Sequence, residues 1–377
     1  MQKQSQQAKP LRAIIAGGGT GGHVFPAIAI ALALKKKLFN IQLLFVGARG
    51  RMEMRKVPEA GFRIIGLDIA GIQRRITWKN VLVPWKLLKS IVAAKRIIKR
   101  YKPDIVIGVG GYASGPVLWA AAGQKIPILL QEQNSYPGLT NRILGKKAQK
   151  ICVAYEGLDK YFKKDKLYLT GNPVRQDIAN IEGKKAEALT YFGLIAKKPV
   201  LFVTGGSLGA RSINESVLSN LRLFVNKDIQ LIWQTGVHFI DQAKEAIKSL
   251  PEAHLYVATF IDRMDYAYAA ADVVVSRAGA IAVSEICLVR KPAILIPSPN
   301  VAEDHQTKNA MALVTHHAAI HIKDDEAQDK LGEEVVNLIF DDEKKHRLKE
   351  KMAGMSYRNA ADRIAGVALS MIHTKKQ

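Results

Sequence analysis

Short runs of β-branched and aliphatic residues alternate with helix-length segments along the whole chain. In the first half these runs are AIIAG, QLLFVG, FRIIGLDI, DIVIGVGG, PILLQEQN and KICVAY. In the second half they are PVLFVTGG, IQLIWQTG, AHLYVATFI, DVVVSRAG, PAILIP and AAIHI. Uninterrupted apolar runs separated by helical patterns are typical of parallel strands that helices cover on both faces. The pattern therefore predicts an α/β fold built on doubly wound parallel sheets.

Two of the predicted strands lead into glycine-rich turns. IIAGGGTGG spans residues 14–22 and LFVTGGSLGA spans residues 201–210, and in each a helical pattern follows. We therefore expect two Rossmann-like domains, with the linker near TGNPVR (170–175), where Pro173 interrupts regular structure. Because ligands of such sheets bind beyond the carboxyl ends of the strands, the active site is expected in the cleft between the domains.

Composition narrows the class of protein. A chain of 377 residues suits two domains, and 48% hydrophobic with 24% charged residues indicates a globular protein. Cys152 and Cys287 lie far apart among apolar residues, which favours reduced core cysteines over a metal or disulfide framework. The longest apolar runs, such as AIAIALAL (27–34), are too short to cross a bilayer, and the polar MQKQSQQAKP is not expected to be a secretory signal.

The net charge of +23 is confined to the first half. Residues 1–175 hold 31 Lys and Arg against 8 Asp and Glu, whereas residues 176–377 hold 25 of each. A one-sided basic excess favours an anionic partner. In residues 71–102, Ile76, Trp78, Leu82 and Trp85 are interleaved with Lys and Arg, as in a segment that lies at a membrane surface. An ordinary helix with a solvated basic face fits that segment equally well, but the charge asymmetry favours an anionic membrane. No nucleic-acid-binding motif accompanies the charge.

The first glycine loop also fits a dinucleotide-binding motif, because Gly17, Gly19 and Gly22 satisfy G-x-G-x-x-G. Such a site normally has an acidic residue at the end of the second strand. Here that strand ends in Gly47-Ala48-Arg49, with no carboxylate until Glu53. An arginine there could accept the phosphate of NADP, but His23 would have no role in such a site, so no dinucleotide cofactor is expected. The chain also lacks an Asp-x-Asp pair for a hard cation, so no metal is expected. A diphosphate would instead be held by helix N-termini, backbone amides and arginine.

Eight sequence blocks resemble the MurG-type enzymes, and they occur in that family's order over nearly the whole chain. They are GGTGGHVFPA (18–27), GVGGYASGP (108–116), QEQNSYPGLTNR (131–142), TGNPVR (170–175), TGGSLGARSIN (204–214), FIDRM (260–264), SRAGAIAVSEI (276–286) and AEDHQTKNA (302–310). These enzymes are N-acetylglucosaminyltransferases that convert lipid I into lipid II in bacterial peptidoglycan synthesis.

The resemblance implies an inverting, metal-independent hexosyltransferase of the GT-B architecture. UDP-N-acetylglucosamine would be the donor, and the acceptor would be the C4 hydroxyl of the muramoyl sugar on undecaprenyl diphosphate. Residues 1–174 would bind acceptor and membrane, residues 175–356 would bind the UDP-sugar, and a C-terminal helix (357–377) would pack back on the first domain. The enzyme would be a peripheral protein on the cytoplasmic face of the inner membrane, serving cell wall synthesis, cell shape and division. Another GT-B UDP-sugar transferase with a lipid acceptor is the alternative, which GVGGYASGP and QEQNSYPGLTNR disfavour.

The resemblance also assigns substrate-binding residues by position. Those expected beside the donor's sugar, diphosphate and nucleotide are Thr20, Gly21, Gly22, Asn134, Arg175, Ser207, Phe260, Ile261, Ala280, Ile281, Ala282, Val283, Ser284, Glu285 and Gln306. Among them, Arg175 and Ser207 would hold the diphosphate, and the backbone of Ile261 would read uracil. Glu285 would accept hydrogen bonds from the ribose hydroxyls, and Gln306 would bond hydroxyls of the sugar.

The catalytic base is expected to be His23 or Glu132. Because imidazole titrates near neutrality, His23 suits deprotonation of a sugar hydroxyl, although it could instead bond the acceptor's diphosphate or fix the loop. Glu132 ends the predicted strand PILLQEQN and offers a carboxylate. The chain departs from some relatives at three positions, with Leu208 where glutamine is common, Ala282 in place of threonine and His305 in place of a second glutamine. The last two departures put some donor contacts in doubt.

Overall fold

The computed structural model describes residues 10–69, 83–251 and 253–374, and the chain divides into two compact units. The first unit comprises residues 1–173 and 359–377, and the second comprises residues 174–358. The linker predicted at residues 170–175 therefore contains the first of these two junctions.

The first unit is built on a seven-stranded sheet in the described part of the chain, and all its strand pairs are parallel. The strand order is β3-β2-β1-β4-β5-β6-β7. Its strands are β1 (Arg12–Ala16), β2 (Gln42–Ala48), β3 (Arg63–Leu67), β4 (Ile105–Gly108), β5 (Ile128–Glu132), β6 (Lys150–Val153) and β7 (Leu167–Leu169).

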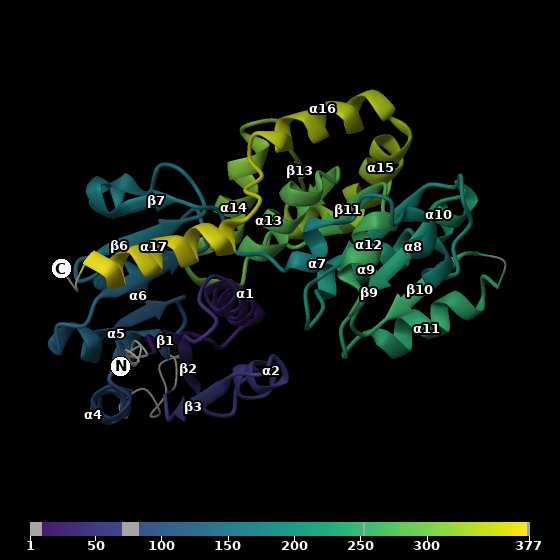
Figure 1. Ribbon diagram of the computed structural model, residues 1–377. Helices are drawn as coiled ribbons and strands as arrows, with labels where there is room; N and C mark the ends of the chain where they lie inside the picture. Colours follow the sequence, from purple (N-terminus) through teal and green to yellow (C-terminus); the bar gives the residue numbers. More distant parts are fainter. Residues whose placement is uncertain (1–9, 70–82, 252, 375–377) are drawn as a thin grey trace, which may run out of the picture. The chain divides into compact units, whose positions relative to one another are not determined.

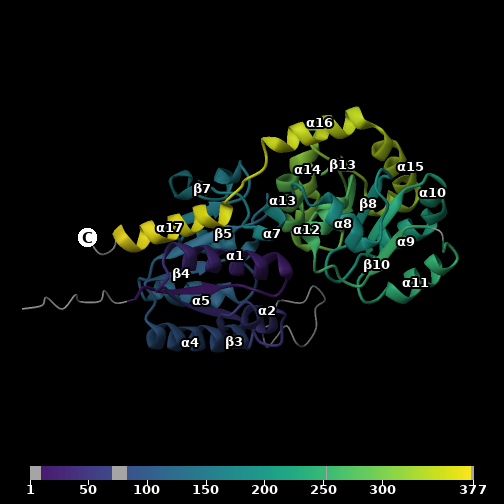
Figure 2. The ribbon, with the colours of Figure 1, turned by 45° about the vertical axis from the view of Figure 1, so that its right-hand side comes forward.

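Helices cover both faces of this sheet, as Figure 2 shows. They are α1 (Gly21–Lys37), α2 (Glu53–Glu59), α4 (Val83–Tyr101), α5 (Ser114–Gly123), α6 (Leu139–Gly145) and α17 (Ala360–Thr374), with 3-10 turns η1 (Leu158–Lys160) and η2 (Lys164–Lys166). Successive strand residues point to opposite faces. Ile15 accordingly packs with α1 and α17, whereas Ile14 packs with α4 and α5. The last helix thus completes the core of the first unit.

The second unit repeats this plan with six parallel strands in the order β10-β9-β8-β11-β12-β13 among the described residues. The strands are β8 (Val200–Thr204), β9 (Gln230–Gln234), β10 (Leu255–Ala258), β11 (Val273–Ser276), β12 (Ala293–Leu295) and β13 (Ile320–His321). The largest fully buried side chains of its core are Trp233, Tyr268, Phe202 and Phe224.

Ten α-helices of the second unit lie within the described residues (Figure 1). They are α7 (Gln176–Ala179), α8 (Lys185–Phe192), α9 (Arg211–Ser219), α10 (Leu221–Asn226), α11 (Ile240–Lys248), α12 (Met264–Ala270), α13 (Ala280–Val289), α14 (His305–Val314), α15 (Ala327–Phe340) and α16 (Asp342–Ala353), with turns η3 (Ala302–Asp304) and η4 (Asp324–Glu326).

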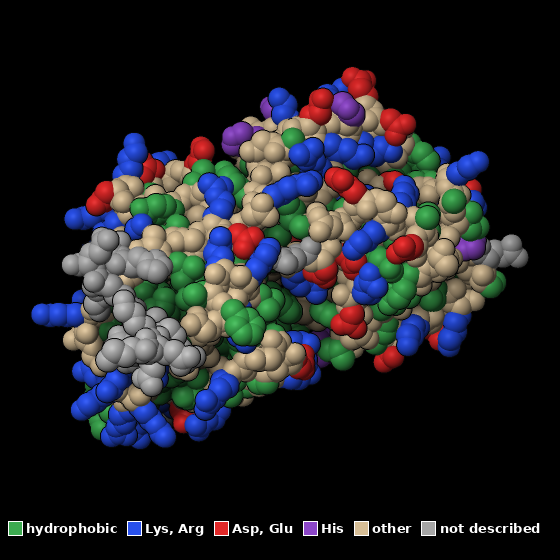
Figure 3. Space-filling view, viewed as in Figure 1, with side chains coloured by type: hydrophobic (Ala, Val, Ile, Leu, Met, Phe, Trp, Pro, Cys, Tyr) green, Lys and Arg blue, Asp and Glu red, His purple; other side chains and the backbone are tan. Residues whose placement is uncertain are grey.

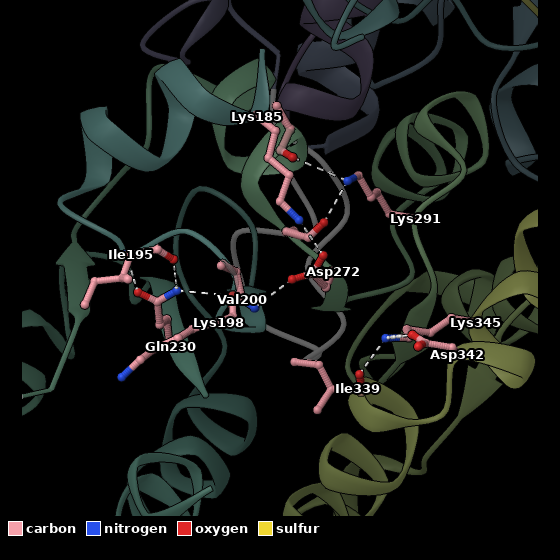
Figure 4. A network of polar contacts seen from close by, with 12 residues as sticks. Lys185, Ile195, Lys198, Val200, Gln230, Asp272, Lys291, Ile339, Asp342 and Lys345 are labelled. Atoms are coloured by element: carbon pink, nitrogen blue, oxygen red, sulfur yellow. Dashed lines mark hydrogen bonds and ion pairs between the residues drawn. The ribbon is translucent and has the colours of Figure 1, made fainter. Parts of the chain in front are cut away.

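The amino ends of the second sheet are joined by a polar network, drawn in Figure 4. Asp272 accepts from the Val200 N–H at 2.9 Å and pairs with Lys185 at 2.8 Å. Lys291 donates to the carbonyl of Ala271 at 2.7 Å, and burial lowers the pKa of its ammonium to about 8. These contacts connect the loops at the amino ends of the strands. The glycine loop lies at the opposite, carboxyl end of the sheet, where a ligand is expected.

The predicted fold class is confirmed: both units are doubly wound parallel α/β sheets, and all twelve predicted strands form. The sequence pattern missed β7, the three-residue edge strand within KDKLYLTG. In each sheet the strand order reverses at one place, between β1 and β4 and between β8 and β11. Such switch points open a crevice for ligands at the carboxyl ends of the strands, so each unit has one predicted binding position.

Candidate functional site

At the switch point of the first unit, two glycine loops touch. Residues 17–20 follow β1 and residues 109–111 follow β4. A Cβ added at Gly111 would lie 2.1 Å from the carbonyl oxygen of Gly18, and one at Gly17 would lie 2.3 Å from Cγ2 of Val109. Gly18 and Gly111 also have positive φ angles, of 145° and 80°. Glycine is therefore required here for close backbone approach as well as for conformation.

His23 lies in the first turn of α1, directly after this loop. Its Nδ1 is 3.1 Å from the Oγ1 of Thr20, and the ring lies over Gly110, where an added Cβ would be 2.9 Å from Nε2. The imidazole is half-buried. The structure thus brings Thr20, Gly21, Gly22 and His23 together at the carboxyl edge of the first sheet.

Glu132, the second candidate base, is buried and fully engaged. Its Oε1 accepts from the backbone N–H and the side-chain amide of Asn134, at 3.0 and 3.1 Å. Its Oε2 accepts from the Gly138 N–H at 3.2 Å and from Asn141 at 2.8 Å. Burial raises the pKa of Glu132, and these hydrogen bonds oppose the rise. The carboxylate thus organises the loop that follows β5, and Asn134 is held by it.

In the second unit, the glycine loop after β8 is held by Gln234 at the end of β9. The side-chain amide of Gln234 donates to Oγ1 of Thr204 at 3.0 Å and to the carbonyl of Gly206 at 2.9 Å. Ser207 and Leu208 are exposed in this loop. Helix α9 begins only at Arg211, so Ser207 lies in the turn before the helix, which Gly209 with φ of 79° continues.

Gln234 also reaches the segment expected to read uracil. Its Oε1 accepts from the Ile261 N–H at 2.8 Å, so the hydrogen-bonding group of Ile261 that remains for a base is its carbonyl. Phe260 beside it is 41% exposed, which leaves an aromatic face on which a planar base could pack.

The stretch from Ala280 to Glu285 forms the start of α13. Val283 points into the core, and the Ser284 hydroxyl donates back to the carbonyl of Ala280 at 2.9 Å. Ala280, Ile281 and Ala282 are partly exposed. The side chain of Val283 therefore does not line the surface that these neighbours present.

Glu285 is the buried carboxylate of this helix. It accepts from the Tyr268 hydroxyl at 3.2 Å, and burial raises its pKa to about 7, against the opposing charge of Arg175. The Nη2 atom of Arg175 is buried and has no hydrogen-bond partner, although it lies 3.4 Å from a carboxylate oxygen of Asp177. This buried guanidinium nitrogen could accommodate a further anion, and this buried carboxylate could accept from further hydroxyl donors.

The raised pKa of Glu285 predicts a pH-dependent stability. The folded protein holds this proton more tightly than the unfolded chain, so stability falls as pH rises from about 4.5 to about 7. Glu285→Gln removes the titration, so its stability relative to wild type should rise with pH, by about 3 kcal/mol in all. Scanning calorimetry at about pH 5 and about pH 8 measures this difference. An equal difference in melting temperature at both values would contradict it.

Gln306 lies in the first turn of α14, after a strained turn. Glu303 and Asp304 have left-handed φ angles of 53° and 50°, and backbone strain of this kind often marks functional sites. The Gln306 Oε1 accepts from the Ser298 N–H at 2.9 Å. Its NH₂ group is therefore the part of the amide that would bond the expected sugar hydroxyl. His305 precedes it in the same turn.

Sequence reasoning missed three organising residues, Glu53, Gln234 and Tyr268. Glu53 is buried and bonds the first glycine loop. Each contacts residues at least 17 positions away along the chain, and only the fold reveals such pairs. The described residues include no cluster of three or more His, Cys, Asp or Glu suited to a metal ion. None of the described helices is both long and apolar enough to traverse a bilayer.

Two family models match the chain. The glycosyltransferase family 28 N-terminal domain matches residues 13–153, and the glycosyltransferase family 28 C-terminal domain matches residues 200–364. A protein of Parabacteroides distasonis is 51% identical over 97% of this chain and 99% of its own length. One of Flavobacterium psychrophilum is 48% identical over 96% of this chain and 98% of its own length. Both are named UDP-N-acetylglucosamine--N-acetylmuramyl-(pentapeptide) pyrophosphoryl-undecaprenol N-acetylglucosamine transferase.

Solved structures agree with these matches. The crystal structure of Acinetobacter baumannii MurG superposes with a TM-score of 0.74 at 27% identity, over 96% of this chain and all of the other. A UDP-glucose:anthocyanidin 3-O-glucosyltransferase in complex with UDP gives a TM-score of 0.71 at 10% identity, over 97% and 99% of the two chains. The second likeness bears on the fold alone.

Proposed function

Because the chain belongs to glycosyltransferase family 28, and within it to the MurG-type enzymes, we propose that it makes lipid II. It transfers N-acetylglucosamine from UDP-N-acetylglucosamine to the C4 hydroxyl of the muramoyl sugar of lipid I, in peptidoglycan synthesis. The support is identity near 50% to proteins named for this reaction, over nearly the whole of both chains.

The observation that carries the donor side is the pair formed by Arg175 and Glu285. A UDP-sugar offers an anionic diphosphate and ribose hydroxyls, which are the partners that a buried guanidinium nitrogen and a buried carboxylate require. The exposed Ser207 and the first turn of α13 supply further donors for phosphate. The second unit therefore holds the nucleotide and its diphosphate through its own residues, and we propose that it needs no metal ion.

The first unit supplies the acceptor side. A sugar hydroxyl becomes a better nucleophile when a base removes its proton during attack. Of the two candidates, His23 is the base in this proposal, because Glu132 already accepts four hydrogen bonds and is buried. Glu132 and Asn134 then shape the loop that meets the acceptor.

A rate comparison tests this function. UDP-N-acetylglucosamine carrying labelled sugar is incubated with a short-chain lipid I analogue or, separately, with diacylglycerol. We expect transfer to the lipid I analogue and none to diacylglycerol. The reverse result would establish another lipid acceptor and overturn the lipid I assignment.

We also propose that α4 forms part of a membrane-binding surface. Trp85, Leu88 and Val92 are 58%, 53% and 41% exposed, and exposed Lys86 and Lys89 flank them. On the face drawn in Figure 3, Lys and Arg side chains gather over this part of the first unit. Aromatic and aliphatic side chains beside cations suit an anionic lipid surface, which would place the enzyme on the cytoplasmic face of the membrane. The other expected contacts, Ile76, Trp78 and Leu82, lie outside the described residues.

The double variant Trp85→Ser/Leu88→Ser should bind vesicles containing anionic lipid about tenfold more weakly or worse, because two apolar groups no longer enter the interface. Vesicle co-sedimentation measures the affinity. Phe340→Ser, at a residue of the second unit that is 53% exposed, is the matched control and should bind as wild type does. Equal binding by all three proteins would remove α4 from the membrane surface.

A further inference from the structure

Glu53 joins two loops of the first unit through one buried carboxylate. It is the first residue of α2 and is 1% exposed. Its Oε2 accepts from the Gly19 N–H at 2.9 Å, and its Oε1 accepts from the Ala48 N–H, at the end of β2, also at 2.9 Å. The glycine loop is thereby tied to the carboxyl end of the neighbouring strand.

The packing around this carboxylate leaves no room for a side chain at two neighbouring glycines. A Cβ added at Gly18 would lie 2.2 Å from the Glu53 Oε1, and one at Gly47 would lie 2.6 Å from its Cγ. Gly18 and Gly47 thus pack closely against Glu53, and Gly19 donates its N–H to the same carboxylate.

The bond to Gly19 changes what the glycine loop can do. In a phosphate-binding loop, backbone N–H groups point at the ligand. Here the Gly19 N–H already donates to the carboxylate of Glu53, and a phosphate beside Gly19 would be repelled by the charge of that carboxylate. The loop instead leads from Gly19 directly to Thr20, whose Oγ1 lies 3.1 Å from the Nδ1 of His23.

We propose that Glu53 is a positioning residue for the transfer reaction. Its carboxylate fixes residues 17–20 so that Thr20 and His23 are held in the geometry that activates the acceptor hydroxyl. This inference rests on the proposed function of the enzyme. It leaves the nucleotide and diphosphate contacts untouched, because Glu53 belongs to the first unit whereas Arg175, Ser207 and Glu285 belong to the second.

The test is the variant Glu53→Gln. Glutamine has nearly the same shape but only one accepting oxygen, so one of the two backbone N–H groups meets an NH₂ group instead. We expect kcat to fall about 10- to 100-fold, since small displacements of catalytic groups have effects of that size. The affinity for UDP should stay within about twofold of wild type, because the residues assigned to the nucleotide and its diphosphate belong to the second unit.

Two further variants separate positioning from folding. Rates are expressed per UDP-binding site, counted by titration calorimetry, so that misfolded protein does not lower kcat. Glu53→Asp keeps the charge but is too short to reach both N–H groups, and it should show an intermediate kcat. Glu59→Gln, on the same helix at a side chain that is 49% exposed, should behave as wild type.

The outcomes are distinct. Wild-type kcat per site in both Glu53 variants, or a loss that only follows the number of UDP-binding sites, would overturn the positioning role. A wild-type enzyme that transfers nothing would overturn the proposed function, and this inference with it.

Discussion

His23→Ala is expected to lower kcat about 10²- to 10⁴-fold, which is the usual contribution of a general base. The residue lies at the switch point of the first sheet, with its ring over Gly110 and its Nδ1 beside Thr20. The affinity for UDP should not change, because Arg175, Ser207 and Glu285, which are assigned to the nucleotide and its diphosphate, belong to the second unit. Single-turnover transfer to a lipid I analogue, together with UDP titration, measures both quantities.

The control for His23 is His346→Ala, at an exposed histidine of α16 whose side chain is 71% exposed. It should retain wild-type kcat. If His23→Ala keeps more than about a tenth of wild-type activity, base catalysis by this residue is contradicted. Glu132→Gln would then be the variant to measure, since it removes the other candidate.

Arg175→Met should reduce kcat/KM for UDP-N-acetylglucosamine about 10²- to 10³-fold, because it removes the partly buried charge that we assign to the departing diphosphate. The Nη2 of Arg175 is buried, has no hydrogen-bond partner and is paired with Asp177 only at 3.4 Å, so a phosphate oxygen would give it a hydrogen bond that it lacks. The charge of Arg175 also lowers the pKa of Glu285. Its loss should raise that pKa, so that Glu285 is protonated more often and accepts hydrogen bonds from the ribose less well.

Comparing UDP with uridine isolates this contact. Arg175→Met should lose most of the affinity for UDP and little of the affinity for uridine, which carries no phosphate. Arg358→Met is the matched control, since Arg358 is 55% exposed and pairs with Glu182 at the surface. Equal losses for UDP and uridine would show that Arg175 supports the fold of the site and not the diphosphate.

The fold could be predicted from sequence because its signals are local. Buried parallel strands read as continuous apolar runs, such as VLFVT in β8, and two glycine turns mark the first strand of each sheet. The strand β7 could not be predicted, since three residues in a lysine-rich segment give no periodicity. Its strand character comes from pairing with β6, which the sequence does not display.

The site was predictable only in part. Motifs made His23, Arg175 and Glu285 candidates, because each stands in or near a recognisable turn or helix start, and their roles stay predictions. The residues that hold these turns in place were not predictable, since Glu53 and Gln234 act on backbone N–H groups 34 and 27 positions away. Nothing in the sequence around Ile261 indicated that its N–H is already engaged.

The two glycine loops look alike in sequence and differ in the groups that hold them. The first is tied by the carboxylate of Glu53, and the second by the neutral amide of Gln234. A carboxylate beneath a loop disfavours a nearby phosphate, whereas an amide does not. This difference accords with an acceptor-activating role for the first loop and a nucleotide-binding role for the second.

The most direct test is analysis of the product formed from UDP-N-acetylglucosamine and a lipid I analogue in the presence of EDTA. We expect the acceptor to gain one N-acetylhexosamine, joined to the muramoyl C4 with inverted anomeric configuration, as seen by mass spectrometry and NMR. A product that forms only after Mg²⁺ or Mn²⁺ is added would contradict the metal-independent mechanism. No product under either condition would contradict the lipid I assignment itself.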